Sequence, residues 1–319
     1  MKIIFFALIF LSIYSYAVYP VALMLLGIIF RKKMSVSNIT PTVTLIISAF
    51  NEEDVIAKKI ENSLLLDYPN GKFEIMVVSD RSTDKTDEIV KRYSKHGVVL
   101  LSQPVRRGKT AGLNDAVKMA KGEVIVFTDA DSMYQPDAIK KMVSYLSDPS
   151  VGLVTGSTKY VPGGDESMAE TSSIYTKLEI FIKQHESDIG SCVGADGAIF
   201  AMRKTLYQPL FNDDINDLVI PLNVVRQGYR VVFNDNLYCF EASSSDSRNE
   251  FQRQIRITNR TLRALFRHWD LMNLFKYPLF SFEMISHKLI RLSVPIFLIA
   301  LIPLNLLLLS EGFIYKMIF

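Results

Sequence analysis

This sequence contains few cysteines and has no large excess of either charge. Its 319 residues contain 2 cysteines, Cys192 and Cys239, which are too few for a disulfide framework and lack the spacing of metal ligands. The 36 basic and 33 acidic residues leave a formal net charge of +3, whereas a nucleic-acid-binding protein normally carries a strong basic excess. Composition therefore excludes a secreted disulfide scaffold and a zinc module, and it gives no support to nucleic acid as a partner.

Apolar residues, in contrast, are abundant. Of all residues 49% are hydrophobic, and the mean hydropathy is +0.19. Soluble domains rarely reach a positive mean hydropathy, so the composition predicts either an unusually large core or segments that lie in lipid.

The first apolar run extends from Ile3 to Phe30 without a charged residue and is followed by Arg31-Lys32-Lys33. A membrane-spanning helix needs about 20 apolar residues, so residues 1–30 are predicted to form an N-terminal transmembrane anchor. A cleaved signal peptide is the alternative, but the apolar character continues past Ser15-Tyr16-Ala17. The basic residues after the run predict that the following chain is cytoplasmic.

A second apolar run, Leu292 to Ser310, follows Lys288 and Arg291. Because these basic residues precede the run, residues 289–319 are predicted to leave the cytoplasm as a second transmembrane segment. We therefore expect a multi-pass protein of the cell (inner) membrane. Whether a further span follows Phe319 stays open.

Between the apolar runs, β-rich segments alternate with segments of helical periodicity. The predicted strands are 42–49, 73–79, 98–101 and 123–128, and the predicted helices are 52–66, 86–93, 110–120 and 136–146. This alternation predicts an α/β fold for residues 31–247, with a mainly parallel sheet covered by helices.

In such a sheet, ligands bind beyond the carboxyl ends of the strands. The first predicted strand is followed by Phe50-Asn51-Glu52-Glu53 in place of the glycine-rich turn of a dinucleotide-binding fold. Arg107-Gly108-Lys109-Thr110 resembles the end of a P-loop, but Gln103 stands where the leading glycine is required. Neither class of phosphate-binding fold is therefore expected.

Asp129-Ala130-Asp131 follows the predicted strand 123–128. Two carboxylates at a strand end can both face one hard divalent cation, which often bridges to substrate phosphates. The alternative is that Asp131 or Ser132 only caps the next helix.

Several motifs in order resemble the family 2 glycosyltransferases, which have the A-type nucleotide-sugar fold. The resemblance covers about Pro41 to Arg260. The matching segments are Ser48–Glu53 (usually P-x-x-N-E), Val78–Thr86 (D-D-G-S-T-D-G-T), Arg107–Asn114 (N-x-G-K-x-x-A-L-N), Asp129-Ala130-Asp131, Gly194–Ala198, Asn216-Asp217 (E-D) and Phe251–Ile257 (QxxRW).

The resemblance implies a Rossmann-like mixed, mostly parallel sheet with helices on both faces, and a role for each matching residue. Asp131 and Asp129 would hold Mg²⁺ or Mn²⁺, and Asp217 would be the general base. The implied substrate-binding residues are Ala49, Asn51, Glu53, Asp80, Lys109, Asp129, Asp196, Arg253 and Arg256.

Three departures from the family pattern bear on function. Arg81 and Lys85 occupy the usual glycine positions of the second motif, and Asn216 replaces the first acidic residue of the E-D motif. Asp213 and Asp214 are nearby rivals to Asp217 as the base. Ile257 replaces the tryptophan of QxxRW, which puts processive polymer synthesis in doubt.

Residues 248–288 combine a basic helix with an apolar, aromatic segment. We expect interfacial helices that lie against membrane lipid; an ordinary domain helix packed on the sheet is the alternative.

The expected function is a membrane-bound inverting transfer of sugar from a nucleotide diphosphate sugar, by default a UDP-sugar with a guanosine diphosphate sugar as the alternative, to a saccharide or lipid-linked acceptor. One alternative is single addition to a polyisoprenyl phosphate. Another, of a different class, is an inactive nucleotide-sugar-binding scaffold of an export assembly. Export or polymerisation proteins are expected partners.

Overall fold

The computed structural model describes residues 1–161, 166–242 and 247–318. The chain divides into two compact units. One unit combines Met1–Arg31 with His268–Phe319, and the other is formed by Lys32–Arg267.

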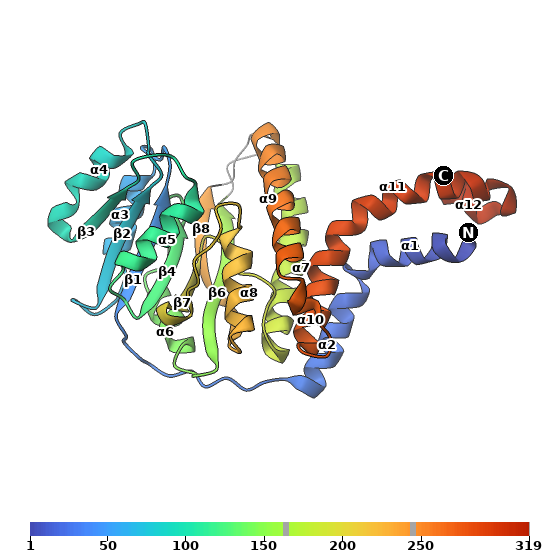
Figure 1. The fold of residues 1–319 in the computed structure, drawn as a ribbon, viewed down its shortest axis with the longest axis horizontal. Coiled ribbons are helices and arrows are strands. Elements are labelled where there is room, and N and C mark those ends of the chain that lie inside the picture. Colours follow the sequence, from blue (N-terminus) through green and yellow to red (C-terminus); the bar gives the residue numbers. More distant parts are fainter. Residues whose placement is uncertain (162–165, 243–246, 319) are drawn as a thin grey trace. The chain divides into compact units, whose positions relative to one another are not determined.

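The larger unit is built on one eight-stranded sheet, with the order β3-β2-β1-β4-β7-β6-β8-β5 (Figure 1). Its strands are β1 (Val43–Ala49), β2 (Phe73–Ser79), β3 (Val98–Ser102), β4 (Val124–Asp129), β5 (Met133–Tyr134), β6 (Val151–Val161), β7 (Phe200–Arg203) and β8 (Arg230–Ala242). Strands β3, β2, β1 and β4 are parallel, β7 is antiparallel to both β4 and β6, and β6 is parallel to β8. The predicted mixed, mostly parallel sheet is confirmed.

Helices cover both faces of this sheet. The helices of the larger unit are α3 (Ile56–Leu64), α4 (Thr86–Arg92), α5 (Lys109–Met119), α6 (Ala138–Tyr145), α7 (Glu166–Ile189), α8 (Asn216–Arg226) and α9 (Ser247–Arg267), with short 3₁₀ turns at Ser94–His96 and Lys204–Leu206. Helices α3 and α6 share a core with Val43 and Leu45. Helix α5 lies on the opposite face, because a Cβ at Gly112 would come within 2.7 Å of Val78 Cγ1, and Val78 points away from that core.

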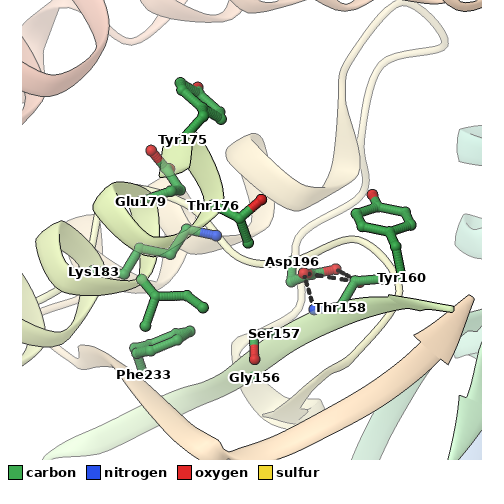
Figure 2. Close-up of a pocket in the computed structure, with 11 residues that line it drawn as sticks. Gly156, Ser157, Thr158, Tyr160, Tyr175, Thr176, Glu179, Lys183, Asp196 and Phe233 are labelled. Carbon is green, nitrogen blue, oxygen red and sulfur yellow. Dashed lines mark hydrogen bonds between the residues drawn. The ribbon is translucent and has the colours of Figure 1, made fainter. Parts of the chain in front are cut away.

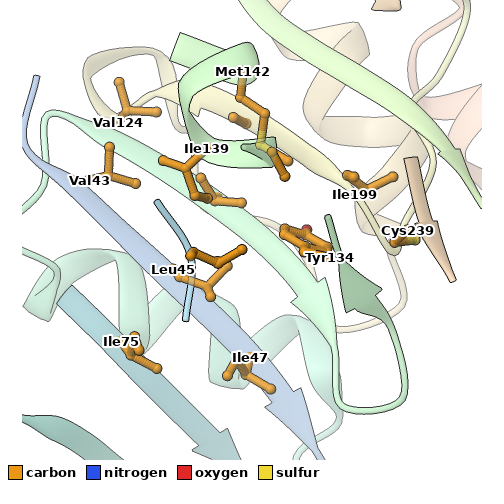
Figure 3. Close-up of a cluster of buried hydrophobic side chains, with 14 of the residues drawn as sticks. Val43, Leu45, Ile47, Ile75, Val124, Tyr134, Ile139, Met142, Ile199 and Cys239 are labelled. Atoms are coloured by element: carbon orange, nitrogen blue, oxygen red, sulfur yellow. The ribbon is translucent and has the colours of Figure 1, made fainter. Parts of the chain in front are cut away.

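The core follows from strands whose side chains are buried on both faces. Val43, Leu45 and Ile47 of β1 alternate toward α3 and α6, where Ile139 and Met142 pack against them (Figure 3). Burying each aliphatic side chain of this size contributes about 1.5–3 kcal/mol. Parallel strands covered on both faces read as continuous apolar runs, which is why they are visible in the sequence.

Helix α3 begins later than the sequence predicts. The helical pattern starts at Glu52, but the helix begins at Ile56. The backbone N–H groups of Glu52 and Glu53 instead donate to Thr86 Oγ1 (2.8 Å) and Asp84 Oδ2 (3.0 Å). The first residues of the predicted helix therefore form hydrogen bonds with the loop after β2 and are not helical.

In the smaller unit, the apolar run Ile3–Phe30 is broken into two helices and is not the single continuous helix that its length suggests. Helices α1 (Lys2–Tyr14) and α2 (Val18–Phe30) are bent by 61° to each other. Pro20 has no N–H to donate to the carbonyl of Tyr16, which weakens the helix at this point. The side chain of Ser15, at the break, donates to the carbonyl of Ser286 over 2.9 Å.

The second apolar run lies within a longer helical segment. It comprises α10 (Pro278–Glu283), a π-helical stretch (Met284–Ile290) and α11 (Arg291–Leu308), preceded by a 3₁₀ turn at Trp269–Met272 and followed by a 3₁₀ turn at Leu309–Glu311 and by α12 (Phe313–Ile318). Within the described residues, Pro278–Glu311 is one helix long and apolar enough to cross a membrane, and the bent pair α1 and α2 passes the same test only when taken together.

Candidate active site

The site lies where the chain changes direction across the sheet. From β1 the chain moves to β2 and β3, and it then returns to β4 on the other side of β1. In open α/β sheets, ligands bind at the carboxyl ends of the two strands that flank such a point. The parallel register pairs Ala49 with Ser79 and Ser48 with Asp129, so the loops after β1, β2 and β4 leave the sheet together.

Asn51 and Glu53 fasten the first loop to the second. Asn51 Oδ1 accepts hydrogen bonds from the N–H of Thr83 (2.8 Å) and from Thr83 Oγ1 (3.3 Å), and Glu53 Oε2 accepts from the N–H of Lys85 (3.0 Å). Asn51 has a φ of 56° and Arg81 has a φ of 58°. Hydrogen bonds therefore hold the two loops together along one edge of the site. Ala49, which precedes the first loop, is buried at 5% exposure.

Asp80 holds the third loop. Its carboxylate accepts hydrogen bonds from the N–H of Arg107 (2.8 Å) and from the N–H of Gly108 (2.9 Å). Gly108 has a φ of 89°, a conformation that favours glycine. The Arg106 guanidinium lies over the Phe50 ring, 3.8 Å from its centroid. Asp80 thus orders the turn that leads into Lys109 and α5.

Lys109 connects the third loop to the carboxylates after β4. Its Nζ lies 2.5 Å from Asp129 Oδ1, while Asp131 is exposed. Burial alone would lower the pKa of Lys109, but the charge of Asp129, followed by those of Asp217 and Asp131, raises that pKa. Lys109 is therefore a cation that pairs with Asp129, and the charge of Asp217 also favours its charged form.

A lysine that the sequence analysis did not select lies beneath the Asp129-Ala130-Asp131 turn. Lys59 of α3 is fully buried and donates to Thr128 Oγ1 (2.9 Å) and to the carbonyl of Ser132. Its Nζ lies 4.1 Å from the centroid of the Tyr134 ring. The signal in the sequence is that Lys59 is three residues after Ile56, on the apolar face of the helix.

Two further carboxylates that the sequence analysis did not assign face this turn. Burial, and then the charges of Asp131 and Asp129, raise the pKa of Glu52 to about 7. Burial, together with the charge of Asp131, also raises the pKa of Glu241 to about 7, although a 2.5 Å hydrogen bond from Ser132 Oγ opposes this. Burial is the main cause of both shifts, and the surplus of negative charge from Asp129 and Asp131 at the end of β4 adds to it.

The donor set fits a divalent cation that binds together with a diphosphate. Within the described part of the chain, no three Asp, Glu, His or Cys side chains are placed to hold a metal ion together. Asp129 and Asp131 supply two carboxylates, and Mg²⁺ commonly takes one or two carboxylates and completes its coordination with substrate phosphates and water. The surplus of negative charge is what such a cation would offset.

Asp217 lies in the first turn of α8, against the turn that contains Asp196. The carbonyl of Asp217 accepts a hydrogen bond from the N–H of Ala195 over 2.7 Å. A Cβ at Gly197 would lie 3.3 Å from Asp217 Oδ2. Asp196 accepts from the N–H of Thr158 (2.9 Å) and from the N–H of Ala198 (3.1 Å). The structure therefore brings the segments of Asp196 and Asp217 together.

The two rivals to Asp217 are held in ion pairs. Asp213 Oδ2 lies 3.1 Å from Arg267 Nη2 and 3.6 Å from Arg263 Nη1. The buried Asp214 pairs with Arg267 and accepts from the N–H of Phe211 (2.9 Å). Burial raises the pKa of Asp214 despite this pairing. These contacts fasten the loop before α8 to α9.

Arg253 and Arg256 lie on the same helix, α9, and both are exposed. They share the helix with exposed apolar residues, Phe251 (64%), Ile255 (41%) and Phe266 (74%). Helix α9 thus has the mixed basic and apolar surface that the sequence predicts, and the role of its two arginines at a diphosphate stays a prediction.

Comparison with solved structures identifies the fold. The mannosyltransferase PcManGT from Pyrobaculum calidifontis, solved in complex with GDP-Man and Mn²⁺, has a TM-score of 0.79 at 22% identity, over 98% of this chain and 88% of that chain. TarS of S. aureus, solved with UDP-GlcNAc, has a TM-score of 0.51 at 18% identity, over 77% and 72% of the two chains. The fold, with carboxylates at the ends of β1, β2 and β4, is that of an A-type glycosyltransferase.

Sequence comparison gives the family. A Nostoc sp. β-monoglucosyldiacylglycerol synthase is 30% identical over 173 residues, which are 52% of this chain and 37% of the relative. The poly-β-1,6-N-acetyl-D-glucosamine synthase of Staphylococcus aureus is 24% identical over 62% of this chain and 49% of its own. The chain belongs to glycosyl transferase family 2, whose family model matches residues 44–211. It spans less than half the length of these curated relatives.

Proposed function

We propose that this chain is a membrane-bound, inverting, metal-dependent glycosyltransferase that moves a sugar from a nucleotide diphosphate sugar to a hydroxyl of a saccharide or lipid-linked acceptor. The observation that carries this proposal is the ion pair between Lys109 Nζ and Asp129 Oδ1 (2.5 Å) at the end of β4. One positive charge therefore lies beside the carboxylates that we propose to face the diphosphate.

The donor is expected to lie across the loops after β1, β2 and β4. The edge that Asn51, Glu53 and Asp80 order is the expected place of the nucleoside, and we favour uridine, as part of a UDP-sugar. Asp131, with Asp129, would hold Mg²⁺ or Mn²⁺, which when bound offsets the charge of the diphosphate leaving group. Lys109 and Arg256 would add positive charge at the same place.

Asp217 is the proposed general base. The acceptor oxygen attacks the anomeric carbon, the bond from that carbon to the diphosphate breaks, and Asp217 takes the proton of the acceptor hydroxyl. The nucleoside diphosphate leaves on the opposite side. A single displacement inverts the anomeric configuration, so an α-linked donor gives a β-linked product.

The enzyme is proposed to act at the inner face of the cell membrane as a multi-pass protein. The supporting observations are the apolar helices of the smaller unit, the Arg31-Lys32-Lys33 cluster and the exposed apolar residues of α9. Phe275 in the smaller unit is 99% exposed. Membrane lipid and an export or polymerisation protein are the proposed partners of these surfaces.

The test is a donor screen on the detergent-solubilised full chain. Release of nucleotide is measured for a panel of UDP- and GDP-sugars with Mn²⁺, with Mg²⁺ and with a chelator. We expect turnover with at least one donor, its loss on chelation, and a loss of about 100-fold or more for Asp131→Asn and Asp217→Asn.

Asp137→Asn is the matched control, because Asp137 makes a surface ion pair with Lys141 and lies outside the proposed site. It should keep the wild-type rate. Nucleotide binding without turnover across the whole panel would support an inactive scaffold instead. Wild-type transfer by Asp217→Asn would remove Asp217 as the base.

The length of the product separates repeated addition from single addition. Ile257 stands where processive synthases carry a tryptophan, and one matched relative is named as a glycolipid synthase while another is named as a polysaccharide synthase. A gel of the labelled product distinguishes one added sugar from a polymer.

A further inference from the structure

A hollow of about 140 Å³ lies between β6, α7 and the Asp196 turn in the larger unit (Figure 2). Its floor includes Gly156 and Ser157 of β6, where the register with β8 shifts. A Cβ at Gly156 would lie 2.0 Å from the carbonyl oxygen of Leu237, so glycine is required for β8 to approach here. The hollow therefore depends on the backbone of the sheet itself.

Asp196, at one wall of the hollow, is engaged with the fold. Its two carboxylate oxygens accept from the Thr158 N–H (2.9 Å) and from the Thr158 hydroxyl (2.9 and 3.0 Å), as the dashed lines in Figure 2 mark. The N–H of Ala198 donates to it as well, over 3.1 Å. Asp196 thus fixes this wall of the hollow.

Besides Asp196, the charged groups of the hollow come from one face of α7. Glu179 and Lys183 are one helical turn apart and both line the hollow. Burial acts to lower the pKa of Lys183, but the charges of Glu179, Asp196 and Asp217 raise it. Lys183 is therefore a cation whose charged form is favoured by Glu179, Asp196 and Asp217.

Two tyrosines lie on two sides of the hollow (Figure 2). Tyr160 is 50% exposed and Tyr175 is 52% exposed, so each presents ring surface to solvent. Thr176 and Ser157 add hydroxyl groups. Aromatic rings with an apolar face, next to hydroxyl, carboxylate and ammonium groups, form a lining for a ligand that has both C–H faces and many hydroxyls.

The same lining disfavours two other acceptors. Glu179 and Asp196 outnumber Lys183, and carboxylates repel a phosphate. The acyl chains of a diacylglycerol would exclude water from the charged side chains Glu179 and Lys183, which is costly. An uncharged sugar is not repelled by the carboxylates, and its hydroxyls can form hydrogen bonds with the polar groups of the lining.

We propose that this hollow takes the reacting sugar of a saccharide acceptor, and that Lys183 donates a hydrogen bond that orients its attacking hydroxyl toward Asp217. The proposal rests on the proposed glycosyltransferase function and narrows its acceptor to a saccharide. The lipid, where there is one, would be carried on the far end of that saccharide.

The experiment uses the detergent-solubilised full chain and the donor found active in the screen. Two rates are measured: nucleotide release in water alone, and transfer to disaccharides of glucose, mannose and N-acetylglucosamine, to a polyisoprenyl phosphate and to a diacylglycerol. We expect transfer to at least one disaccharide. For Lys183→Met and Tyr175→Ala, the acceptor KM should rise about tenfold or more, as expected for loss of one hydrogen bond to a charged group.

The donor KM should stay within about twofold of wild type in both variants, because neither side chain is in the proposed donor site. Lys177→Met is the matched control, since Lys177 is exposed on the same helix and does not line the hollow. It should leave the acceptor KM unchanged. Tyr175 is half exposed, so its replacement preserves the fold even if that of Lys183 does not.

The two proposals fail in different ways. Absence of nucleotide release with every donor overturns the proposed function and, with it, the acceptor site. Normal nucleotide release with transfer only to the polyisoprenyl phosphate or the diacylglycerol overturns the acceptor site alone. So does an acceptor KM that neither Lys183→Met nor Tyr175→Ala changes.

Discussion

The N–H of Ala195 donates a hydrogen bond to the carbonyl oxygen of Asp217 over 2.7 Å. Pro221, inside α8 and four residues after Asp217, explains why that carbonyl is available. Proline has no N–H to complete the intrahelical bond to residue 217. The proline thus allows the Asp196 turn to dock on the first turn of the helix that carries the proposed base.

Pro221→Ala is expected to raise stability and lower activity. Alanine is more favourable than proline in a helix interior by about 3 kcal/mol, and its new N–H would compete with Ala195 for the Asp217 carbonyl. We expect a higher midpoint of thermal unfolding and about a tenfold slower transfer, which is about 1.4 kcal/mol of barrier. An unchanged transfer rate in a stabilised variant would show that this hydrogen bond does not position Asp217.

Lys59→Met should weaken both the fold and the metal site. The variant leaves Thr128 Oγ1 and the buried carbonyl of Ser132 without their donor, which costs about 2 kcal/mol of unfolding free energy. Loss of such support typically weakens metal affinity by about 10-fold or more. Denaturant unfolding and the half-maximal Mn²⁺ concentration measure the two effects. Lys58→Met, at the exposed neighbouring position, is the control and should change neither.

Arg81→Gly is expected to stabilise the protein. Arg81 has a φ of 58°, and a left-handed conformation costs an ordinary residue about 1–2 kcal/mol. Glycine avoids this cost, but it loses more conformational entropy on folding, which offsets part of the gain. We expect a net gain of about 0.5–1 kcal/mol in thermal unfolding.

Asn51→Gly is the matched comparison, at a φ of 56°. Asparagine tolerates this conformation, and its side chain accepts from the N–H of Thr83. Glycine should therefore lower stability here, by about 1 kcal/mol. If both variants gained stability equally, the Asn51 hydrogen bond would contribute nothing.

Asp148→Asn should remove a pH-dependent part of the stability. The side chain of Ser150, the N–H of Ser35 and other donors lower the pKa of Asp148 below its ordinary 3.8. Its contribution is complete above about that value and is lost as the pH falls through the lower pKa of the folded state. At pH 7 we expect a loss of about 2 kcal/mol on substitution, and below pH 4 the difference between variant and wild type should shrink. Parallel stability curves from pH 7 to 2 would contradict this.

Arg267→Met should destabilise the loop before α8. Asp214 has a side chain that is 2% exposed and is paired with Arg267, so the variant leaves a buried carboxylate uncompensated at a cost of about 3 kcal/mol. Arg263→Met is the control, because the Arg263 side chain is 65% exposed and a surface pair contributes about 1 kcal/mol or less. Equal losses in the two variants, measured by denaturant unfolding, would rule out a special role for Asp214.

The sequence predicted the parts of the fold that rest on local pattern. Buried parallel strands are continuous β-branched runs, so β1, β2 and β4 lie within two residues of their predicted places. The residues just after these strands could therefore be predicted as site residues. The contacts of Lys59 did not, because its partners Thr128 and Ser132 are about 70 residues away in the chain and a lysine in a helix is ordinarily exposed.

Lys183 was missed for a related reason. Its place in the hollow depends on how α7 lies against β6, which helical periodicity alone does not give. The break between α1 and α2 depends likewise on a long-range contact, that of Ser15 with Ser286. Glu52 was within reach of sequence reasoning, since it follows Asn51 in the motif, but its burial and its approach to Asp131 needed coordinates.

Strand β7 has only four residues, Phe200–Arg203, and it is antiparallel to both neighbours. It separates β3-β2-β1-β4, whose loops are proposed to meet the donor, from β6 and β8, which border the hollow. Because each side has its own ladder of backbone bonds to β7, substitutions on one side need not disturb the register of the other. With the donor and the acceptor on the two sides that we propose, a duplicated gene for such a chain could diverge toward a new acceptor while it keeps its nucleotide specificity.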